Sequence, residues 1–343
     1  MRDHRSRIST ATFNEWYQER EFAQNIRNGT PYFNGPSPVP DPERHSPSNL
    51  LQCHRKIYYR QLNAPKEDED PEGIFWTGRR FEEDIIVPYL QDAVVGEDTY
   101  VRNSMWIDTT VETEVGELRF KGSTDPVIVD RESEPLLVTE VKTTTSLDQK
   151  TETSTHHRAQ VHAYMRGLLE KYDRDVDEAV VIYGDRDSMM VKAFQEPFDV
   201  AFWNRVVEWA VSHTDFRVHD DLPPGTPEQD WECKFCPYRR RCGKTSGPFQ
   251  DEGPRGFLPL MDTYPREQVV EYLNAYEGNS GELTPTLAHQ YPELAEEYDV
   301  REWRCSRCDS GFEWNEVKWD GDTESPPMCP VCLEKDEPRE MSG

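Results

Sequence analysis

The sequence predicts an α/β fold: a mixed β-sheet core flanked by helices, with a small metal-binding module at the C-terminal end. Three observations predict it. Strand-like apolar runs alternate with helix-like segments between residues 46 and 245. Four of the eight cysteines form two Cys-x-x-Cys pairs within the last forty residues. A length of 343 residues is enough for two or three domains.

Residues 1–45 are predicted to be an N-terminal extension, with one helix-like segment at 8–27 followed by a loop rich in proline and glycine. Ser46 and Pro47 then form a helix-start signal, because serine caps a helix and proline suits its first turn. A second helix is expected from about Gly73 to Leu90.

The strands of the core come next. We expect residues 118–120 and 127–129 to be neighbouring strands joined through the turn at 122–125, and a further strand at 136–142. The elements expected after it are a helix at 156–171, strands at 180–183 and 191–194, and a helix at 198–216. The domains expected are a core at 46–245, a linker with short helices at 246–300, a cysteine module at 301–334 and a charged tail at 335–343.

The charge balance is unusual, with 66 acidic against 39 basic residues and a net charge of −27. The acids occur in every region, so an acidic tail does not explain them. We interpret them as the surface of a protein adapted to molar salt, from a halophilic archaeon or its virus. At about 1 M salt the Debye length is only ~3 Å, so this charge does not exclude a nucleic-acid partner.

No stretch approaches 18 apolar residues, and the first residues lack an apolar signal segment. We therefore expect a cytoplasmic protein without membrane contact. Disulfides are rare in that compartment, so the eight cysteines are expected to bind metals.

The strand at 136–142 carries an acid and a lysine two residues apart. Side chains alternate along a strand, so Glu140 and Lys142 share one face. By itself this pattern also fits an exposed strand edge with an incidental ion pair. Asp125 follows Gly122 in a turn, and two carboxylates from adjacent strands can hold Mg²⁺ or Mn²⁺, with the Val141 carbonyl completing the ligand set. Lys142 would then orient a water or stabilise charge on a phosphate.

Two helices offer further candidates. Glu82 or the adjacent Glu83 could supply a third carboxylate, although a solvated helix face explains either one equally well. Gln160 and Tyr164 are four residues apart and so lie on one helix face.

Gly78-x-x-x-Glu82, Gly122-x-x-Asp125, Glu140-x-Lys142 and Gln160-x-x-x-Tyr164 have the order and spacing of a RecB-like nuclease of the PD-(D/E)xK superfamily. Over residues 46–245 the chain more narrowly resembles the iron–sulfur exonucleases of CRISPR systems, the fourth of the Cas proteins. The resemblance implies a restriction-endonuclease-like core, in which Asp125 and Glu140 are metal ligands and Lys142 is catalytic. It also implies that Gln160 and Tyr164 contact DNA or support the site. Those relatives usually carry histidine at the Glu82 position, but glutamate also ligates divalent metals.

The first cysteine set is Cys233-x-x-Cys236-x₅-Cys242, with Cys53 the remaining unassigned thiol. Four thiolates suit either Zn²⁺ or an iron–sulfur cluster. The resemblance favours a 4Fe–4S cluster on Cys53, Cys233, Cys236 and Cys242. The alternative is a three-cysteine zinc site completed by a ligand such as His54.

The second set is Cys305-x-x-Cys308 and Cys329-x-x-Cys332, separated by twenty residues. This spacing is a strong signal for a Cys₄ Zn²⁺ site in a zinc ribbon. Such a module folds around its metal, because it is too small to bury a core of its own. Its ligand could be DNA or a protein partner, and we expect its tryptophans to pack around the metal rather than to stack on bases.

The sequence therefore predicts a metal-dependent DNA exonuclease that acts on single-stranded ends, with the 5′→3′ polarity that the resemblance implies. Spacer acquisition in CRISPR antiviral defence, repair and viral recombination all use this chemistry. The basic residues expected to line a DNA groove are Arg55, Lys56, Arg60, Arg79, Arg80, Arg239, Arg240 and Arg241. The alternative is a DNA-binding or adaptor protein without catalytic activity, in which the same fold and ribbon recognise a partner.

Overall fold

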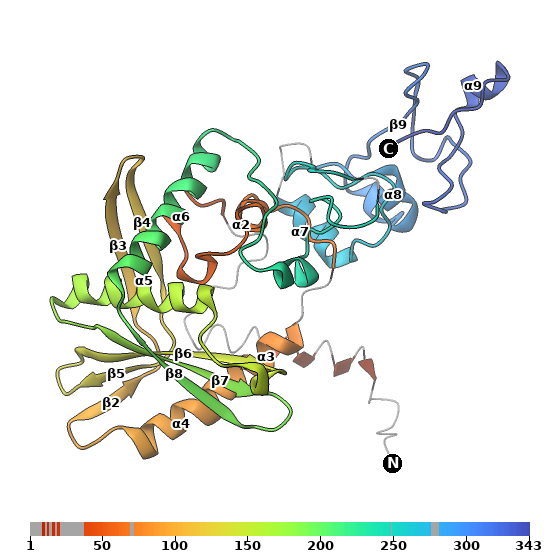
Figure 1. Ribbon diagram of the computed structural model, residues 1–343. Coiled ribbons are helices and arrows are strands. Elements are labelled where there is room, and N and C mark those ends of the chain that lie inside the picture. Colours follow the sequence, from red (N-terminus) through yellow and green to blue (C-terminus); the bar gives the residue numbers. More distant parts are fainter. Residues whose placement is uncertain are drawn as a thin grey trace, which may run out of the picture.

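A computed structural model gives the fold, and it describes residues 9, 10, 12, 13, 16, 17, 19, 20, 38–68, 72–247, 249–275 and 281–343. Its centre is a five-stranded sheet in the order β2-β5-β6-β7-β8 (Figure 1). The strands are β2 (Thr99–Arg102), β5 (Val127–Asp130), β6 (Pro135–Thr144), β7 (Glu178–Asp185) and β8 (Val191–Pro197). Only the β6–β7 pair within this sheet is parallel, so the predicted mixed sheet is confirmed.

Helices cover both faces of this sheet, as predicted. On one side lie α5 (Thr155–Tyr172) and α6 (Val200–Val218), with the short η5 (Leu147–Gln149) before α5 (Figure 1). The other side is covered by a continuous helical segment made of α3 (Glu72–Phe81), the π-helix η3 (Glu82–Ile86), α4 (Val87–Tyr89) and the π-helix η4 (Leu90–Val94). Val138 packs into the α5 side and Val141 against the opposite side. Strand β6 is therefore buried on both faces, which explains its nearly continuous apolar sequence.

A second sheet, in the order β1-β4-β3, corrects one expectation. Residues 118–120 and 127–129 were expected to be neighbouring strands, but they lie in β4 and β5 of different sheets. The strands of the second sheet are β1 (Arg44–His45), β3 (Trp106–Thr113) and β4 (Gly116–Ser123). β4 pairs with β3 in a tight hairpin, for which Gly116 takes a φ of 105°. Phe120 then packs on Trp203 of α6, with ring centroids 5.1 Å apart, so β4 buries its apolar side away from β5.

The segment after Ser46 also differs from the expectation. A 3₁₀ turn, η2 (Pro47–Asn49), replaces the first part of the predicted helix, and Leu51 has a φ of 50°. Helix α2 (His54–Gln61) starts only after that break. Leu50 and Leu51 are both buried, so packing overrides local helix preference here. Most of the predicted helix at 8–27 lies outside the described residues.

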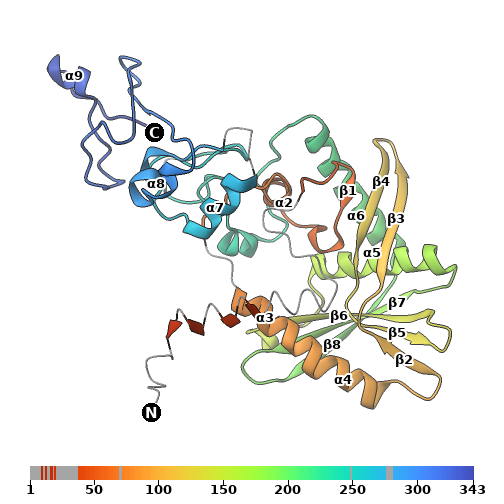
Figure 2. The ribbon, with the colours of Figure 1, turned by 180° about the vertical axis from the view of Figure 1, so that it is seen from behind.

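The part after residue 246 contains more packed structure than a linker. Helices α7 (Arg266–Ala275) and α8 (Pro285–Gln290) and the turn η7 (Leu294–Glu296) enclose a buried cluster that includes Tyr264 and Leu287. The cysteine module follows with β9 (Trp303–Arg304), β10 (Gly311–Phe312) and α9 (Pro330–Glu334), at the end away from the large sheet (Figure 2). Residues of the predicted charged tail return to this module, where Ser342 pairs with Arg304 and Met341 is buried. Among the described residues, no helix has the length and apolar character needed to span a membrane.

Candidate active site and metal centres

Glu140 is the most unusual side chain of the sheet, because it is a carboxyl group that is completely buried. Its ion-pair partner is the Nζ of Lys142, two residues further along β6. Apart from that ion pair, the carboxylate of Glu140 has no hydrogen-bond partner in the part of the chain that the structure describes. Buried carboxylates are normally paired and fully hydrogen-bonded or bound to a metal. One ion pair leaves most of the acceptor capacity of this carboxylate unused, which fits a bound cation.

Asp125 lies beside Glu140, in the turn before β5. Its Oδ2 accepts a hydrogen bond from the backbone N–H of Val141 at 2.8 Å. Burial, followed by the negative charge of Asp125, raises the pKa of Glu140 to about 8, against the opposing effect of Lys142. Burial also raises the pKa of Asp125 itself. Two carboxylates crowded in this way need a positive charge between them to ionise together at neutral pH.

Glu82 is the third acid of this cluster and the first residue of the π-helix η3. Burial, followed by the charge of Asp125, raises the pKa of Glu82 to about 7. Glu83 instead forms a 3.2 Å ion pair with Arg80 on the exposed helix face. The structure therefore brings Glu82, rather than Glu83, to the other two acids. A π-helix turn is frequent at functional sites, because its wider turn re-aims a side chain.

A glycine of β7 fixes the start of that turn. A Cβ at Gly184 would overlap the ring of Phe81, the residue immediately before Glu82. Because Gly184 has no side chain, the ring of Phe81 can lie directly against the backbone of β7. This contact fixes the position of Phe81 and therefore of Glu82, the next residue. Sequence reasoning missed this residue, and its only signal was a glycine inside an otherwise apolar strand.

Gln160 and Tyr164 share one face of α5, as predicted. The Nε2 of Gln160 donates a hydrogen bond to the Tyr164 hydroxyl at 2.8 Å, and both side chains are buried. Burial, followed by the charges of Glu140 and Asp125, raises the pKa of Tyr164 well above its usual value. The pair therefore lies behind the carboxylates and not on a surface open to DNA.

The first cysteine set gathers at one pocket, which Cys53, Cys233, Cys236 and Cys242 line together with Arg55 and Lys56. All four thiols are free. Burial raises the pKa of Cys236 to about 12, so a cationic partner is needed to keep its thiolate in place. The Nη1 of Arg55 lies 3.9 Å from the Cys242 sulfur and adds positive charge. This donor set fits a metal centre with four thiolates.

His54 is the alternative fourth ligand in the hypothesis of a three-cysteine zinc site, but its side chain lies away from the cysteines. Its ring stacks on Trp209 at 4.7 Å, and its Nδ1 lies 3.4 Å from the Nδ1 of His213. It does not line the cysteine pocket. The placement thus favours Cys53 over His54 as the fourth ligand.

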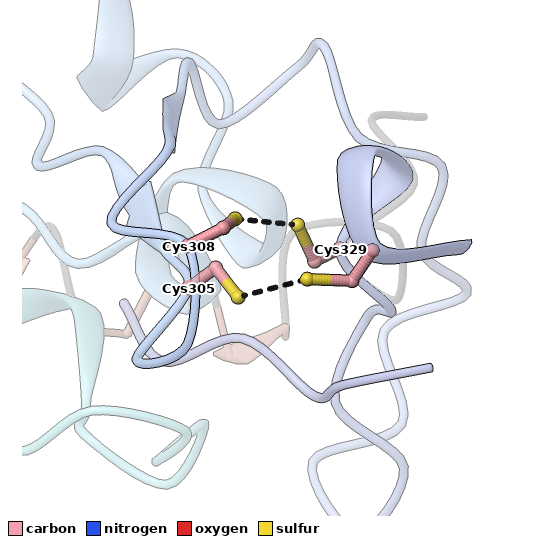
Figure 3. A group of neighbouring side chains, drawn as sticks. Cys305, Cys308 and Cys329 are labelled. Carbon is pink, nitrogen blue, oxygen red and sulfur yellow. Dashed lines mark hydrogen bonds between the residues drawn. The ribbon is translucent and has the colours of Figure 1, made fainter. Parts of the chain in front are cut away.

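The second cysteine set forms a compact metal-binding cluster. The sulfurs of Cys305 and Cys332 are 3.7 Å apart, and those of Cys308 and Cys329 are 3.6 Å apart (Figure 3). The four ligand atoms all lie within 4.8 Å of one another. Trp303 is almost fully buried against this cluster. The predicted small C-terminal metal-binding domain is therefore confirmed, and Trp303 packs instead of facing solvent.

The predicted basic groove needs a correction. Arg55 and Arg241 are buried and structural: the Nε of Arg55 donates to the Pro223 carbonyl, and Arg241 donates to the carbonyls of Gly253 and Gly256. Arg80 pairs with Glu83 and Asp84 on the helix surface. A run of basic residues does not reveal which of them are buried, so the sequence assigned too many cations to the surface.

The mixed sheet with its buried carboxylates and adjoining lysine is an arrangement that enzymes use to bind a divalent metal. The family model of the PD-(D/E)XK nuclease superfamily matches residues 36–243, and the chain belongs to this superfamily, as the sequence predicted. None of the curated proteins matches the chain.

Two solved proteins resemble the structure. One is SSO0001, with 16% sequence identity, a TM-score of 0.42, and coverage of 66% of this chain and 94% of that chain. The other is an alkaline exonuclease, LHK-Exo from Laribacter hongkongensis, with 12% identity, a TM-score of 0.37, and coverage of 52% and 90%. LHK-Exo in complex with dAMP gives 14% identity, a TM-score of 0.35, and coverage of 51% and 92%.

Proposed function

We propose that this protein is a divalent-metal-dependent DNA exonuclease that hydrolyses phosphodiester bonds at single-stranded ends, with 5′→3′ polarity. The observation that carries the proposal is Glu140, which is fully buried with Lys142 as its ion-pair partner and with no other hydrogen bond among the described residues, beside a half-buried Asp125. Membership of a nuclease superfamily supports the same chemistry. The nuclease domain would span residues 46–245, and the role could lie in repair, recombination or CRISPR spacer acquisition.

The roles of the residues follow from their placement. Asp125, Glu140 and Glu82, with the Val141 carbonyl, would hold Mg²⁺ or Mn²⁺. Such an ion, when bound, polarises the scissile phosphate and lowers the pKa of an attacking water. Lys142 reaches the same point from β6 and is placed to orient that water or to stabilise developing negative charge. Asp125 is held in position by the Val141 N–H, and the Gln160–Tyr164 pair supports the carboxylates from behind.

The two cysteine sets would hold different cofactors. A tetrahedron with Zn–S bonds of about 2.3 Å has sulfur–sulfur edges of about 3.8 Å. The distances of 3.7 and 3.6 Å in the C-terminal cluster fit this geometry, which supports Zn²⁺ on Cys305, Cys308, Cys329 and Cys332. The irons of a 4Fe–4S cluster occupy separate corners, so its thiolates stand further apart. The set that lines the pocket at Cys53 suits such a cluster.

The proposal is tested by cleavage of fluorescent single-stranded oligonucleotides with Mn²⁺ or Mg²⁺ at high salt. We expect Lys142→Ala to lower the rate by about 10²- to 10³-fold, as the loss of one transition-state donor does in other enzymes. Lys171→Ala is the matched control, because Lys171 is a surface lysine whose Nζ donates to the Trp106 carbonyl. Unchanged cleavage by Lys142→Ala would disprove the mechanism. No cleavage by protein loaded with its cofactors would favour a DNA-binding or adaptor role. Blocking the 5′ or the 3′ end separately gives the polarity.

A further inference from the structure

The short helix η6 (Asp230–Phe235) carries two large aromatic side chains in solvent, one on each side of Cys233. Trp231 is 44% exposed, and Phe235 is 80% exposed. Aromatic side chains that are exposed beside a candidate site are possible contact points for a ligand. Catalysis as proposed above uses neither of them.

Trp231 lies toward the active site. Its ring contacts that of His156 at the start of α5, with centroids 5.8 Å apart. His156 is close enough to Lys142, Lys56 and Lys150 for their positive charges to lower its pKa, after the larger effect of burial, to about 4. The His156 ring is therefore neutral at physiological pH. The ring pair of Trp231 and His156 therefore lies near lysines that include Lys142 of the proposed active site.

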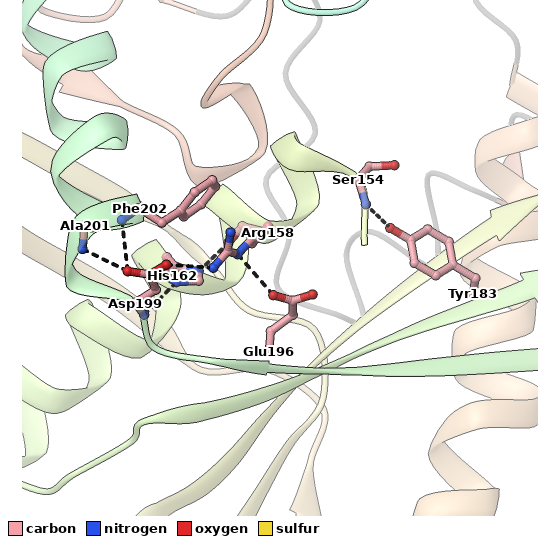
Figure 4. A network of polar contacts seen from close by, with 8 residues as sticks. All are labelled: Ser154, Arg158, His162, Tyr183, Glu196, Asp199, Ala201 and Phe202. Carbon is pink, nitrogen blue, oxygen red and sulfur yellow. Dashed lines mark hydrogen bonds and ion pairs between the residues drawn. The ribbon is translucent and has the colours of Figure 1, made fainter. Parts of the chain in front are cut away.

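The start of α5 is held rigidly. The Ser154 N–H donates to the Tyr183 hydroxyl at 3.0 Å, and Arg158 forms ion pairs with Glu196 at 3.2 Å and Asp199 at 3.0 Å (Figure 4). These contacts fix the helix turn that carries His156 against the sheet. A platform built on this turn keeps its position relative to β6.

The other side of η6 is anchored at the cysteine pocket. The Oε2 of Glu232 accepts a hydrogen bond from the backbone N–H of Cys53 at 3.0 Å. Its Oε1 accepts one from the Gln229 N–H at 3.2 Å, which closes a capping box at the start of η6. Three consecutive residues, 231–233, thus contact the α5 start, the Cys53 backbone and the pocket, respectively.

We propose that Trp231, seated against His156, is a base-stacking platform that holds single-stranded DNA between the carboxylate cluster and the cysteine pocket. This inference rests on the proposed function, because it assigns the single-stranded substrate a seat beside that site. Aromatic faces bind any unpaired base, whereas paired bases already stack on one another. The platform therefore selects unpaired ends without reading their sequence.

The test uses full-length, cofactor-loaded protein in the Lys142→Ala background, so that bound DNA is not cleaved. Binding of a fluorescent oligothymidylate is compared with binding of an abasic oligonucleotide of equal length. Trp231→Leu should raise the Kd for oligothymidylate about tenfold, within the range known for loss of one base stack, and leave the abasic Kd unchanged. Trp231→Phe, which retains an aromatic face, should stay close to wild type.

Trp106→Leu is the matched control, because Trp106 is 48% exposed on β3 in the second sheet. It should change neither Kd. The proposal is wrong if Trp231→Leu weakens binding of both oligonucleotides equally, or if it does not weaken binding of oligothymidylate. Visible absorption of each variant shows whether its cysteine pocket is intact. Failure of the proposed function gives a different result: the protein with an intact Lys142 then binds oligothymidylate in a Trp231-dependent manner without cleaving it.

Discussion

The two cysteine sites use the same ligand type in opposite ways. The C-terminal cluster takes all its ligands from residues 305–332, and its sulfurs are already within 4.8 Å of one another. The other set consists of Cys53 together with Cys233, Cys236 and Cys242, which follow the whole five-stranded sheet in sequence, and the four residues line one pocket. With metal bound, the C-terminal site would organise a short segment, whereas the proposed cluster site would tie together the two ends of a large domain.

This difference decides what each site can contribute. A short segment with a small core gains its folding free energy from metal binding itself. The large domain has its own buried clusters around β6, so a metal cluster on its cysteines would act chiefly as a cross-link that limits the conformations of the unfolded chain. The two sites should therefore fail separately and by different amounts.

The largest effect is expected for Cys329→Ser. The variant should lose all of its bound zinc and leave the ribbon unfolded, because the small buried cluster around Trp303 cannot hold this segment together without the metal. Zinc content and limited proteolysis measure this loss. Cleavage of single-stranded DNA should remain within about twofold of wild type, and a parallel collapse of activity would show that the two sites are not independent.

Cys233→Ser should have the next largest effect. It should remove the visible absorption of the cluster and lower the free energy of unfolding of the nuclease domain by about 5 kcal/mol, the entropy expected for a cross-link across nearly 190 residues. Denaturant unfolding of the variant and of wild type gives this difference. A variant that keeps its absorption would refute Cys233 as a ligand.

The stability of the nuclease domain and that of the C-terminal cysteine module should also differ in their dependence on pH. Burial lowers the pKa of His45 to about 3 and that of His213 to about 2, so both stay neutral in the folded domain. The unfolded chain takes up these protons below pH 6.5. Stability is therefore complete above that pH and is lost as the pH falls, by about 3 kcal/mol per histidine at pH 4. Residues 301–334 contain no histidine.

Unfolding curves between pH 7 and 4 test this dependence. His45→Gln can still hydrogen-bond Thr214, the present partner of His45 at 3.0 Å, but cannot titrate. It should reduce the slope of stability against pH by about one proton. An unchanged slope would mean that His45 does not contribute to acid sensitivity.

The smallest effect is expected for Gly225→Ala. A Cβ at this position would stand 2.9 Å from the Cys242 sulfur, which forces the pocket to open slightly. Overpacking of this kind costs about 1–3 kcal/mol, and we expect cluster loss on air exposure to become faster. Gly247→Ala is the control, because the nearest atom to its Cβ is 3.5 Å away. Equal behaviour of the two variants would place Gly225 outside the cluster environment.

The sequence was sufficient to predict the position of functional residues wherever they lie a few residues apart in one motif. The Glu140-x-Lys142 strand, the Gln160–Tyr164 helix face and the C-terminal cysteine pairs all lie where their spacing indicates. It was insufficient where long-range packing decides. Phe120 packs on Trp203, more than eighty residues away, and this contact helps to place β4 outside the main sheet. Which of Glu82 and Glu83 becomes the third carboxylate of the cluster likewise depends on a π-turn, and the periodicity of the side chains does not predict a π-turn.

That π-turn also bears on how the site could diverge among related chains. A π-turn holds one more residue than an α-turn, so loss of a single residue from Glu82–Ile86 would leave an unbroken helix. Because the π-turn already accommodates that extra residue, its loss would leave the helix before and after it in phase. The residues of the turn itself would change direction, so Glu82 would leave the cluster while every other ligand stayed in place. One deletion could thus change a three-carboxylate centre into a two-carboxylate centre without disturbing the fold.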